Sequence, residues 1–182
     1  MADFRKAADF VLRNEDETLS GRVTPDPTDH DPRAVARFGV NSQWHPELIA
    51  CGFYDESKVT CQQALWMAED VFKLRYFGAI RGYSIIPQDI ANKWADLAFN
   101  EGPEQATKIV QRAVNYVLPN MQPRLQIDGL VGDQTIGRVN AAEPERLLPT
   151  IKEQAKNFYL GAASTNARIK SDLKGLLLRV EK

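Results

Sequence analysis

The sequence predicts a mainly helical protein with little or no β-sheet. Apolar residues recur in most segments at the three- and four-residue spacing of an amphipathic helix. Glycine and proline residues separate several of these segments, and no repeat or low-complexity tract interrupts the chain. With 182 residues, of which 43% are hydrophobic, the chain is long enough for one compact domain, or for a domain with a small appendage.

The first predicted helix covers residues 3–14, and its apolar stripe is continued by Glu15. Asp16 and Glu17 turn toward the opposite side. Desolvation disfavours a charged carboxyl group, so Glu15 would have a raised pKa and could serve as a general acid near neutral pH. The alternative is that the helix ends before Glu15 and the carboxyl group is simply solvated. The stripe consists of Phe4, Ala8 and Val11, flanked by Ala7 and Leu12.

Residues 18–31 are rich in proline, aspartate, threonine and glycine, which favour turns and predict a long loop. Long loops in compact domains are usually functional or disordered. Residues 34–40 recover apolar character and predict a short extended piece. We expect the loop and this extended piece to fold back over Glu15.

The middle of the chain begins with a short helical piece at residues 46–53. Thr60 and Gln63 have the spacing of a capping box, which predicts a helix that begins there and runs to Phe77. Gly78 and Gly82 then mark a turn.

Pro87 and Pro103 suit the first positions of two further helices, which end near Gly102 and Val117. Their connection is short, which predicts an antiparallel packed pair. Proline residues 119 and 123 end the second helix.

The last third contains glycine turns followed by helices. Residues 125–135 lack the regularly spaced oxygen ligands of a calcium loop, so a structural turn is favoured, with Thr135 opening a helix. Two more helices are predicted at residues 147–160 and 169–180.

The net charge and the apolar runs of the chain argue against nucleic acid and membranes as binding partners. The net charge of −1 gives no general attraction to nucleic acid or to an anionic membrane. No apolar run is long enough to span a membrane and no secretory signal is present, so we expect synthesis in the cytoplasm.

His30 and His45 are too few for a zinc site, and we expect no metal and no cofactor. Cys51 and Cys61 are expected as free thiols.

The order of these features resembles glycoside hydrolase family 108, the lysozyme-like N-acetylmuramidases with a peptidoglycan-binding-like C-terminal region. The similarity runs over nearly the whole chain. It implies a lysozyme-like core at residues 1–123 and a helical peptidoglycan-binding-like tail at residues 124–182, packed with the core as one unit. The matching positions are Asn14-Glu15, the loop from Asp26 to Asp31, Phe38-Gly39-Val40, Tyr76-Phe77, then Asp96, Asn100 and Gly102, then Asp128-Gly129 with Gly132 and Thr135, and Gly175 to Val180.

The resemblance implies hydrolysis of the β-1,4 bond between N-acetylmuramic acid and N-acetylglucosamine in peptidoglycan, with Glu15 as the catalytic acid. A second carboxylate would activate water or stabilise the positive charge on the sugar. Asp29 and Asp31 are the candidates for this role, and Asp26 is a weaker one. The alternative is that each of these acids only caps the loop.

Substrate contacts are also expected. Trp44 lies in a loop beside two polar residues and is the best aromatic candidate for a sugar contact, whereas Trp94 lies on an apolar helix stripe and is expected in the core. By the resemblance, the other substrate-binding residues are Phe38, Tyr76, Phe77 and Asn100.

The chain departs from the family pattern beside the candidate acid. Asp16-Glu17 replaces a glycine pair, and Ala36 replaces a threonine. The main hypothesis is therefore a muramidase, either a phage-type endolysin or an enzyme carried out by a dedicated secretion system. The alternatives are a non-catalytic descendant that binds cell wall or a protein partner, and a helical interaction protein unrelated to glycans.

For the muramidase we expect a monomer that binds peptidoglycan glycan strands, with no nucleic-acid partner and no membrane insertion. A holin or a secretion system would bring it to the periplasm or the cell wall.

Overall fold

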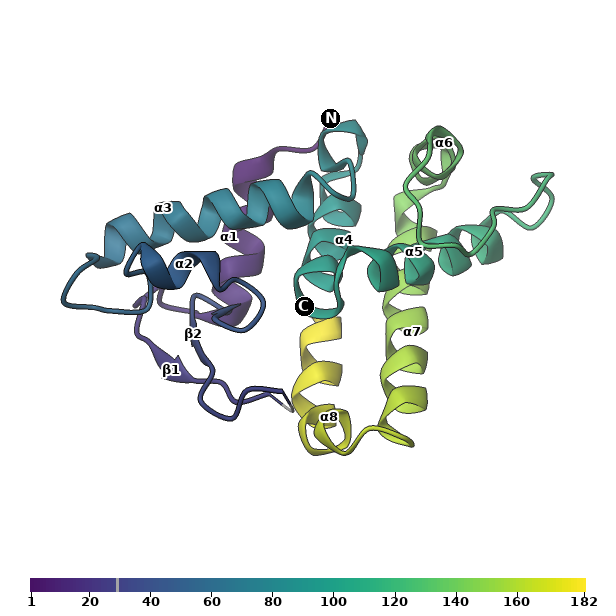
Figure 1. Ribbon diagram of the computed structural model, residues 1–182. Helices are drawn as coiled ribbons and strands as arrows, with labels where there is room; N and C mark the ends of the chain where they lie inside the picture. Colours follow the sequence, from purple (N-terminus) through teal and green to yellow (C-terminus); the bar gives the residue numbers. More distant parts are fainter. Residues whose placement is uncertain (29) are drawn as a thin grey trace. The chain divides into compact units, whose positions relative to one another are not determined.

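The computed structural model describes residues 1–28 and 30–182, and α-helices make up most of it (Figure 1). The predicted mainly helical fold is confirmed. The chain divides into two compact units. We call Ala8–Arg75 the N-terminal unit, and Met1–Ala7 together with Tyr76–Lys182 the C-terminal unit. The boundary predicted after residue 123 falls inside the C-terminal unit and stays a prediction.

The N-terminal unit contains a small antiparallel sheet with the strand order β1-β2-β3, of which β1 and β2 are labelled in Figure 1. Ala36 is the partner of Thr24 on one side and of Asn41 on the other. The extended piece predicted at residues 34–40 is confirmed at residues 35–37 and 40, with a turn at residues 38–39 between them, whereas β1 lies in a segment predicted as loop. The strands are β1 (Thr24–Pro25), β2 (Val35–Arg37) and β3 (Val40–Asn41).

A two-residue turn joins β2 to β3. Phe38 and Gly39 have φ angles of 52° and 74°, the left-handed conformation that a tight hairpin turn of this length requires. Glycine adopts this conformation without steric cost, whereas a residue with a Cβ is strained there.

The N-terminal unit also contains the part of α1 (Phe4–Glu15) from Ala8 onward, α2 (Glu47–Ala50) and α3 (Cys61–Val71). The predicted capping box is confirmed, because the Thr60 hydroxyl accepts the Gln63 N–H at 3.3 Å and the Gln63 side chain accepts the Thr60 N–H at 3.0 Å. A wider π-helical segment, η1 (Phe72–Phe77), follows α3 directly.

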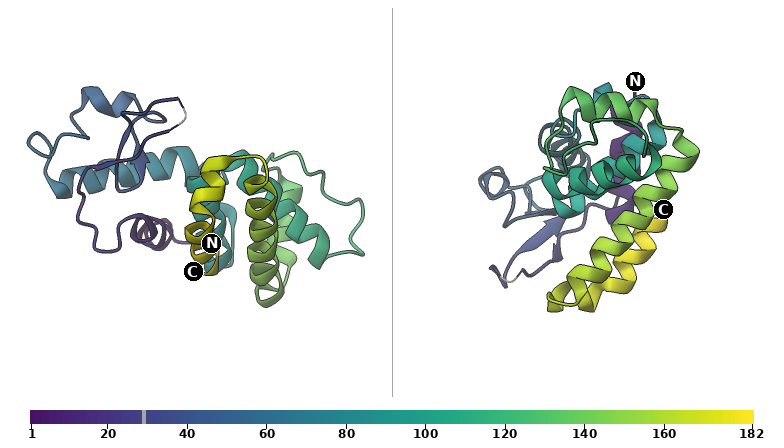
Figure 2. Two further views of the ribbon diagram at one scale, coloured as in Figure 1. Left: turned by 90° about the horizontal axis from the view of Figure 1, so that it is seen from below. Right: turned by 90° about the vertical axis from the view of Figure 1, so that its right-hand side faces the viewer.

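The C-terminal unit is built around α7, which packs against α8, α5 and α4. Helices α7 and α8 run side by side in opposite directions (Figures 1 and 2). Asn166 caps α8, because its side chain accepts the N–H groups of Arg168 and Ile169. The elements are η2 (Gly82–Ser84), α4 (Gln88–Glu101), α5 (Pro103–Val117), α6 (Asp133–Ala141), α7 (Pro144–Ala163) and α8 (Ala167–Glu181).

The prediction of an antiparallel α4–α5 pair is wrong. Gly102 alone connects the two helices, with φ 81° and ψ 152°, and they run in clearly different directions (Figure 1). A helical hairpin needs a connection of about two to five residues to reverse the chain. One extended glycine makes a corner instead.

The core of the C-terminal unit surrounds Trp94, which is 0% exposed. Its indole N–H finds no acceptor among the described residues. The expected core role of this tryptophan is confirmed. Other fully buried side chains of the unit are Ile90, Ile109, Val110, Val114, Leu147, Ile151 and Ala155.

A buried ionic cluster ties α4 to α8. Asp96, 2% exposed, accepts hydrogen bonds from Lys93 at 3.3 Å and from Arg179 at 2.8 Å and 3.1 Å. The Lys93 ammonium, also buried, donates to the backbone carbonyl of Arg179 at 3.1 Å. Burial lowers the pKa of Lys93, and Asp96 opposes that shift.

In the described part of the chain, no helix combines the length and apolar character that crossing a bilayer requires.

Asp96→Asn is expected to lower the free energy of unfolding by at least about 3 kcal/mol, because it leaves two cations without their buried counter-charge. Asp89→Asn, on an exposed position of the same helix, should change it by less than about 0.5 kcal/mol. Urea unfolding of both variants measures the difference. Equal stability of the two variants would contradict this account of the cluster.

Candidate functional site

Glu15 is the last residue of α1 and is half-buried. Its side chain lies directly over Gly39, since a Cβ placed on that glycine would stand 2.4 Å from the Glu15 Cγ and 2.8 Å from its Oε2. The expectation that the extended piece folds back over Glu15 is therefore confirmed for the β2–β3 turn. The helix does not end before Glu15, so the solvated alternative is not favoured.

Asp16, the residue after Glu15, stabilises the start of the loop that follows α1. Its carboxylate accepts hydrogen bonds from the Gly21 N–H at 2.8 Å and from the Ser20 hydroxyl at 2.9 Å. Burial raises the pKa of Asp16, but these hydrogen bonds, with one from Thr18, outweigh it and leave the pKa below its ordinary value. The acid that replaces a glycine in the family pattern thus fastens the start of the following loop.

Arg37 in β2 is 2% exposed and binds three backbone carbonyls. Its Nε donates to Gly21 at 2.7 Å, and its Nη1 donates to Phe53 at 2.8 Å and to Val59 at 3.2 Å. The guanidinium carbon also lies 5.9 Å from the centre of the Phe53 ring. Arg37 thereby joins the loop after α1 and the segment before α3 to the strand that leads to Gly39.

The loop acids are held by local hydrogen bonds. The Asp31 carboxylate, half-buried, accepts the Arg33 N–H at 2.9 Å, and the Asp26 carboxylate accepts the Asn41 amide at 2.7 Å. These bonds are the loop-capping role that sequence reasoning offered as an alternative. The other candidate for the second carboxylate, Asp29, lies outside the described residues.

Two aromatic candidates of the N-terminal unit have opposite environments. Phe38 is buried, with its ring against Gly21, so it presents little surface to a ligand. Trp44 is 62% exposed and lies between β3 and α2. Its neighbour His45 is buried, and burial lowers the pKa of that imidazole although Glu47 opposes the shift. Trp44 therefore keeps the accessible face that a sugar contact needs.

The aromatic candidates of the C-terminal unit belong to a ring cluster. The Phe77 ring is buried and packs on Phe4 at 5.6 Å and on Tyr83 at 4.9 Å between ring centres. Tyr76 is half-buried and packs on Phe99 at 4.8 Å. Phe77 in particular contributes to the interior.

Asn100 and Glu101, at the end of α4, meet Tyr159 of α7. The Asn100 amide donates to the Tyr159 hydroxyl at 3.0 Å. Burial raises the pKa of Glu101, with Tyr159 and Arg179 opposing it, and burial also raises the pKa of Tyr159. This carboxyl group is perturbed in the way that functional acids often are.

The predicted site residues thus fall into both units. The N-terminal unit contains Glu15, Asp26, Asp31, Phe38 and Trp44, and the C-terminal unit contains Tyr76, Phe77 and Asn100. Sequence reasoning missed Arg37, although a charged residue within the apolar stretch 34–40 was a signal for a buried cation. In the described part of the chain, no group of three or more His, Cys, Asp or Glu side chains is placed to hold a metal, and the absence of a metal stays a prediction.

One comparison with known proteins matches only part of the C-terminal unit, and another covers nearly the whole chain. Residues 105–181 match the family model described as "Predicted Peptidoglycan domain". The solved structure of Brucella abortus SagA has a similar fold, with a TM-score of 0.66 and 19% sequence identity over 98% of this chain and 89% of that chain. A search of curated proteins finds no match. The chain therefore carries a peptidoglycan-type segment from α5 to α8.

Gly39→Ala should destabilise the protein by about 3 kcal/mol, because it adds backbone strain and drives a methyl group into Glu15. Gly52→Ala is the matched control. Gly52 has a similar φ of 72°, but its added Cβ would come no closer than 3.2 Å to the Lys58 side chain and 3.7 Å to the Val59 Cγ2. We expect about 1 to 2 kcal/mol there. Urea unfolding of both variants tests the contact, and equal losses would argue against it.

Glu101→Gln should remove a pH dependence of stability. Because the folded state raises the pKa of Glu101 above 4.5, the protonated form stabilises the fold below that value, and this contribution is lost as pH rises through the raised pKa. The unfolding free energy of the wild type should therefore fall relative to that of Glu101→Gln as pH rises, because the glutamine side chain stays neutral at every pH. Glu153→Gln, exposed on α7, should show no such trend. A difference independent of pH would contradict the assignment.

Proposed function

We propose that this protein is a peptidoglycan hydrolase, an N-acetylmuramidase in which Glu15 is the general acid. The observation that carries the proposal is the position of Glu15 at the end of α1, half-buried and over the backbone of Gly39. The resemblance to glycoside hydrolase family 108 and the peptidoglycan description of residues 105–181 support it.

In this mechanism, Glu15 donates a proton to the glycosidic oxygen between N-acetylmuramic acid and N-acetylglucosamine while positive charge develops on the sugar ring. The Gly39 position has no side chain, so the Glu15 side chain can lie directly on the backbone of the turn. Asp31 and Asp29 remain the candidates for the second carboxylate.

The supporting frame is the Arg37 network. Because the guanidinium binds the carbonyls of Gly21, Phe53 and Val59, the strand before Gly39 has little freedom to move. A general acid contributes to rate only when its geometry is kept, so this frame would serve catalysis through Glu15. Trp44 would offer a stacking face to a sugar ring.

A second candidate function is a non-catalytic cell-wall-binding protein. Ala36, buried in β2, favours it, because the resembled family has a threonine there whose hydroxyl could orient water or substrate. The same experiment separates the two functions.

Wild-type protein incubated with purified peptidoglycan should release fragments with muramic acid reducing ends, measured by mass analysis. Glu15→Gln should slow this by at least about a hundredfold, since the amide cannot donate a proton as an acid. Glu17→Gln, two residues away and exposed, should retain activity within about twofold. Urea unfolding checks that both variants fold.

Unchanged release by Glu15→Gln would refute its role as the acid. Binding of wild type to peptidoglycan with no new reducing ends would refute the hydrolase and support the non-catalytic candidate.

A further inference from the structure

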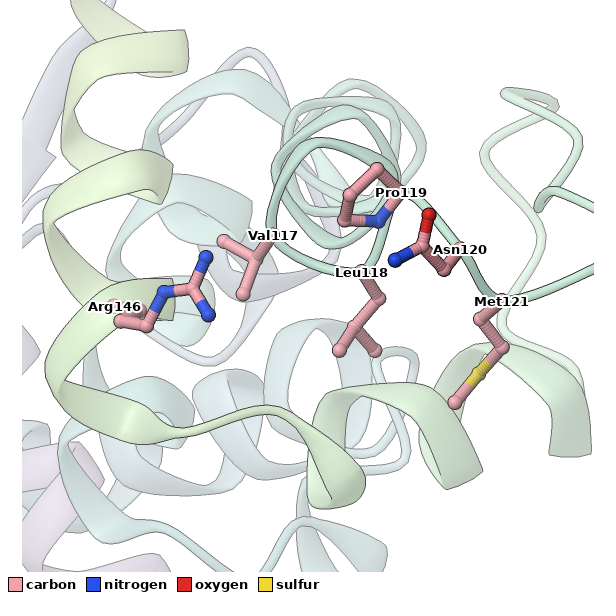
Figure 3. A pocket seen from close by; sticks show the side chains of 6 residues that line it. All are labelled: Val117, Leu118, Pro119, Asn120, Met121 and Arg146. Atoms are coloured by element: carbon pink, nitrogen blue, oxygen red, sulfur yellow. The ribbon is translucent and has the colours of Figure 1, made fainter.

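A surface pocket of about 500 Å³ lies in the C-terminal unit, between the end of α5 and the first turn of α7 (Figure 3). It lies within residues 105–181, the segment that matches the peptidoglycan family model. Its volume is in the range of small-ligand sites. The lining residues are Val117, Leu118, Pro119, Asn120, Met121 and Arg146.

The loop that forms one wall is held in place by side chains outside the pocket. The Asn115 side chain accepts the Leu125 N–H at 2.9 Å and donates to the Leu125 carbonyl at 2.8 Å, which closes the base of the loop. Arg124 donates to the Asn115 carbonyl at 2.8 Å, and Arg138 donates to the carbonyl of Pro123. The wall is therefore formed before any ligand arrives.

The pocket combines apolar walls with two polar side chains. Figure 3 shows the Arg146 guanidinium beside Val117, and the Asn120 amide close to Pro119. Within the described residues, neither polar side chain has a hydrogen bond or ion pair. Arg124 and Arg138, in contrast, are used in holding the loop. Arg146 is thus a cation available to a ligand.

The side chains of the pocket indicate which chemical groups a ligand should carry. A guanidinium presents paired N–H donors that match a carboxylate, and an amide matches a peptide group. The apolar wall suits methyl groups, and among the described residues no aromatic side chain lines the pocket to stack on a sugar ring. A short peptide with alanine methyl groups and a free carboxylate fits better than a glycan does.

We propose that this pocket binds the stem peptide of peptidoglycan, with a peptide carboxylate on Arg146. Alanine methyl groups lie against Leu118 and Met121, and the Asn120 amide pairs with the peptide backbone. This inference rests on the proposed cell-wall function and deepens it. The C-terminal unit binds the stem peptide, while Glu15 protonates the glycosidic bond of the glycan strand.

The test is a titration of the full chain with a synthetic stem peptide that carries its free carboxylates, followed by methyl NMR. The chain has three methionines, so Met121 reports on the pocket while Met67, in the N-terminal unit, serves as an internal control. The Met121 methyl signal should shift with peptide concentration, and the Met67 signal should not. A Met121 signal that stays fixed at saturating peptide overturns the proposal.

The ion pair is tested by Arg146→Gln, which should weaken binding about tenfold, as expected for loss of a charge-assisted hydrogen bond. Arg112→Gln, an exposed arginine of α5 outside the pocket, should change affinity by less than about twofold. The fully amidated peptide should bind wild type as weakly as the acid binds Arg146→Gln. Equal affinity of wild type and Arg146→Gln for the acid overturns the proposal.

The two proposals fail separately. Glu15→Gln should bind the peptide with wild-type affinity, because the pocket lies in the other unit. Release of muramic acid reducing ends without peptide binding would overturn only the peptide site. Peptide binding without such release would overturn only the hydrolase.

Discussion

The buried guanidinium of Arg37 is the interaction on which the N-terminal unit depends. A cation that is 2% exposed must be compensated, and here the described partners are backbone carbonyls from two separate segments of the chain together with an aromatic ring. The strands of this unit are only two or three residues long, so their ladder hydrogen bonds are too few to fix the sheet by themselves. The hydrogen bonds of one side chain hold the β2–β3 turn in its place against Glu15.

The C-terminal unit also depends on a buried charged side chain, which here is the carboxylate of Asp96 and not a cation. Asp96 is buried between Lys93 and Arg179, and the lysine also bonds to a backbone carbonyl of α8. Such a cluster favours one register of α8 on α4, because sliding one helix along the other would leave buried charges without partners. The peptidoglycan-type segment therefore has a fixed partner in α4, which lies before it in the chain.

Much of this fold could be predicted from local sequence. The capping box at Thr60 and the placement of Glu15 on the inner stripe of α1 both depend on residues within one or two turns of each other. The α4–α5 corner could not, because the short connection near Gly102 was expected to reverse the chain, whereas the backbone conformation of that single residue sets the direction of α5. Arg37 was missed because its partners are 16 or more residues away.

The three tryptophans give the two units different optical signatures. Trp94 is sealed in an apolar interior with no hydrogen-bond acceptor among the described residues, whereas Trp44 and Trp66 of the N-terminal unit are 62% and 59% exposed. Emission from Trp94 should lie at shorter wavelength than emission from the other two. Single-tryptophan versions of the chain would therefore reveal whether both halves melt together or one after the other.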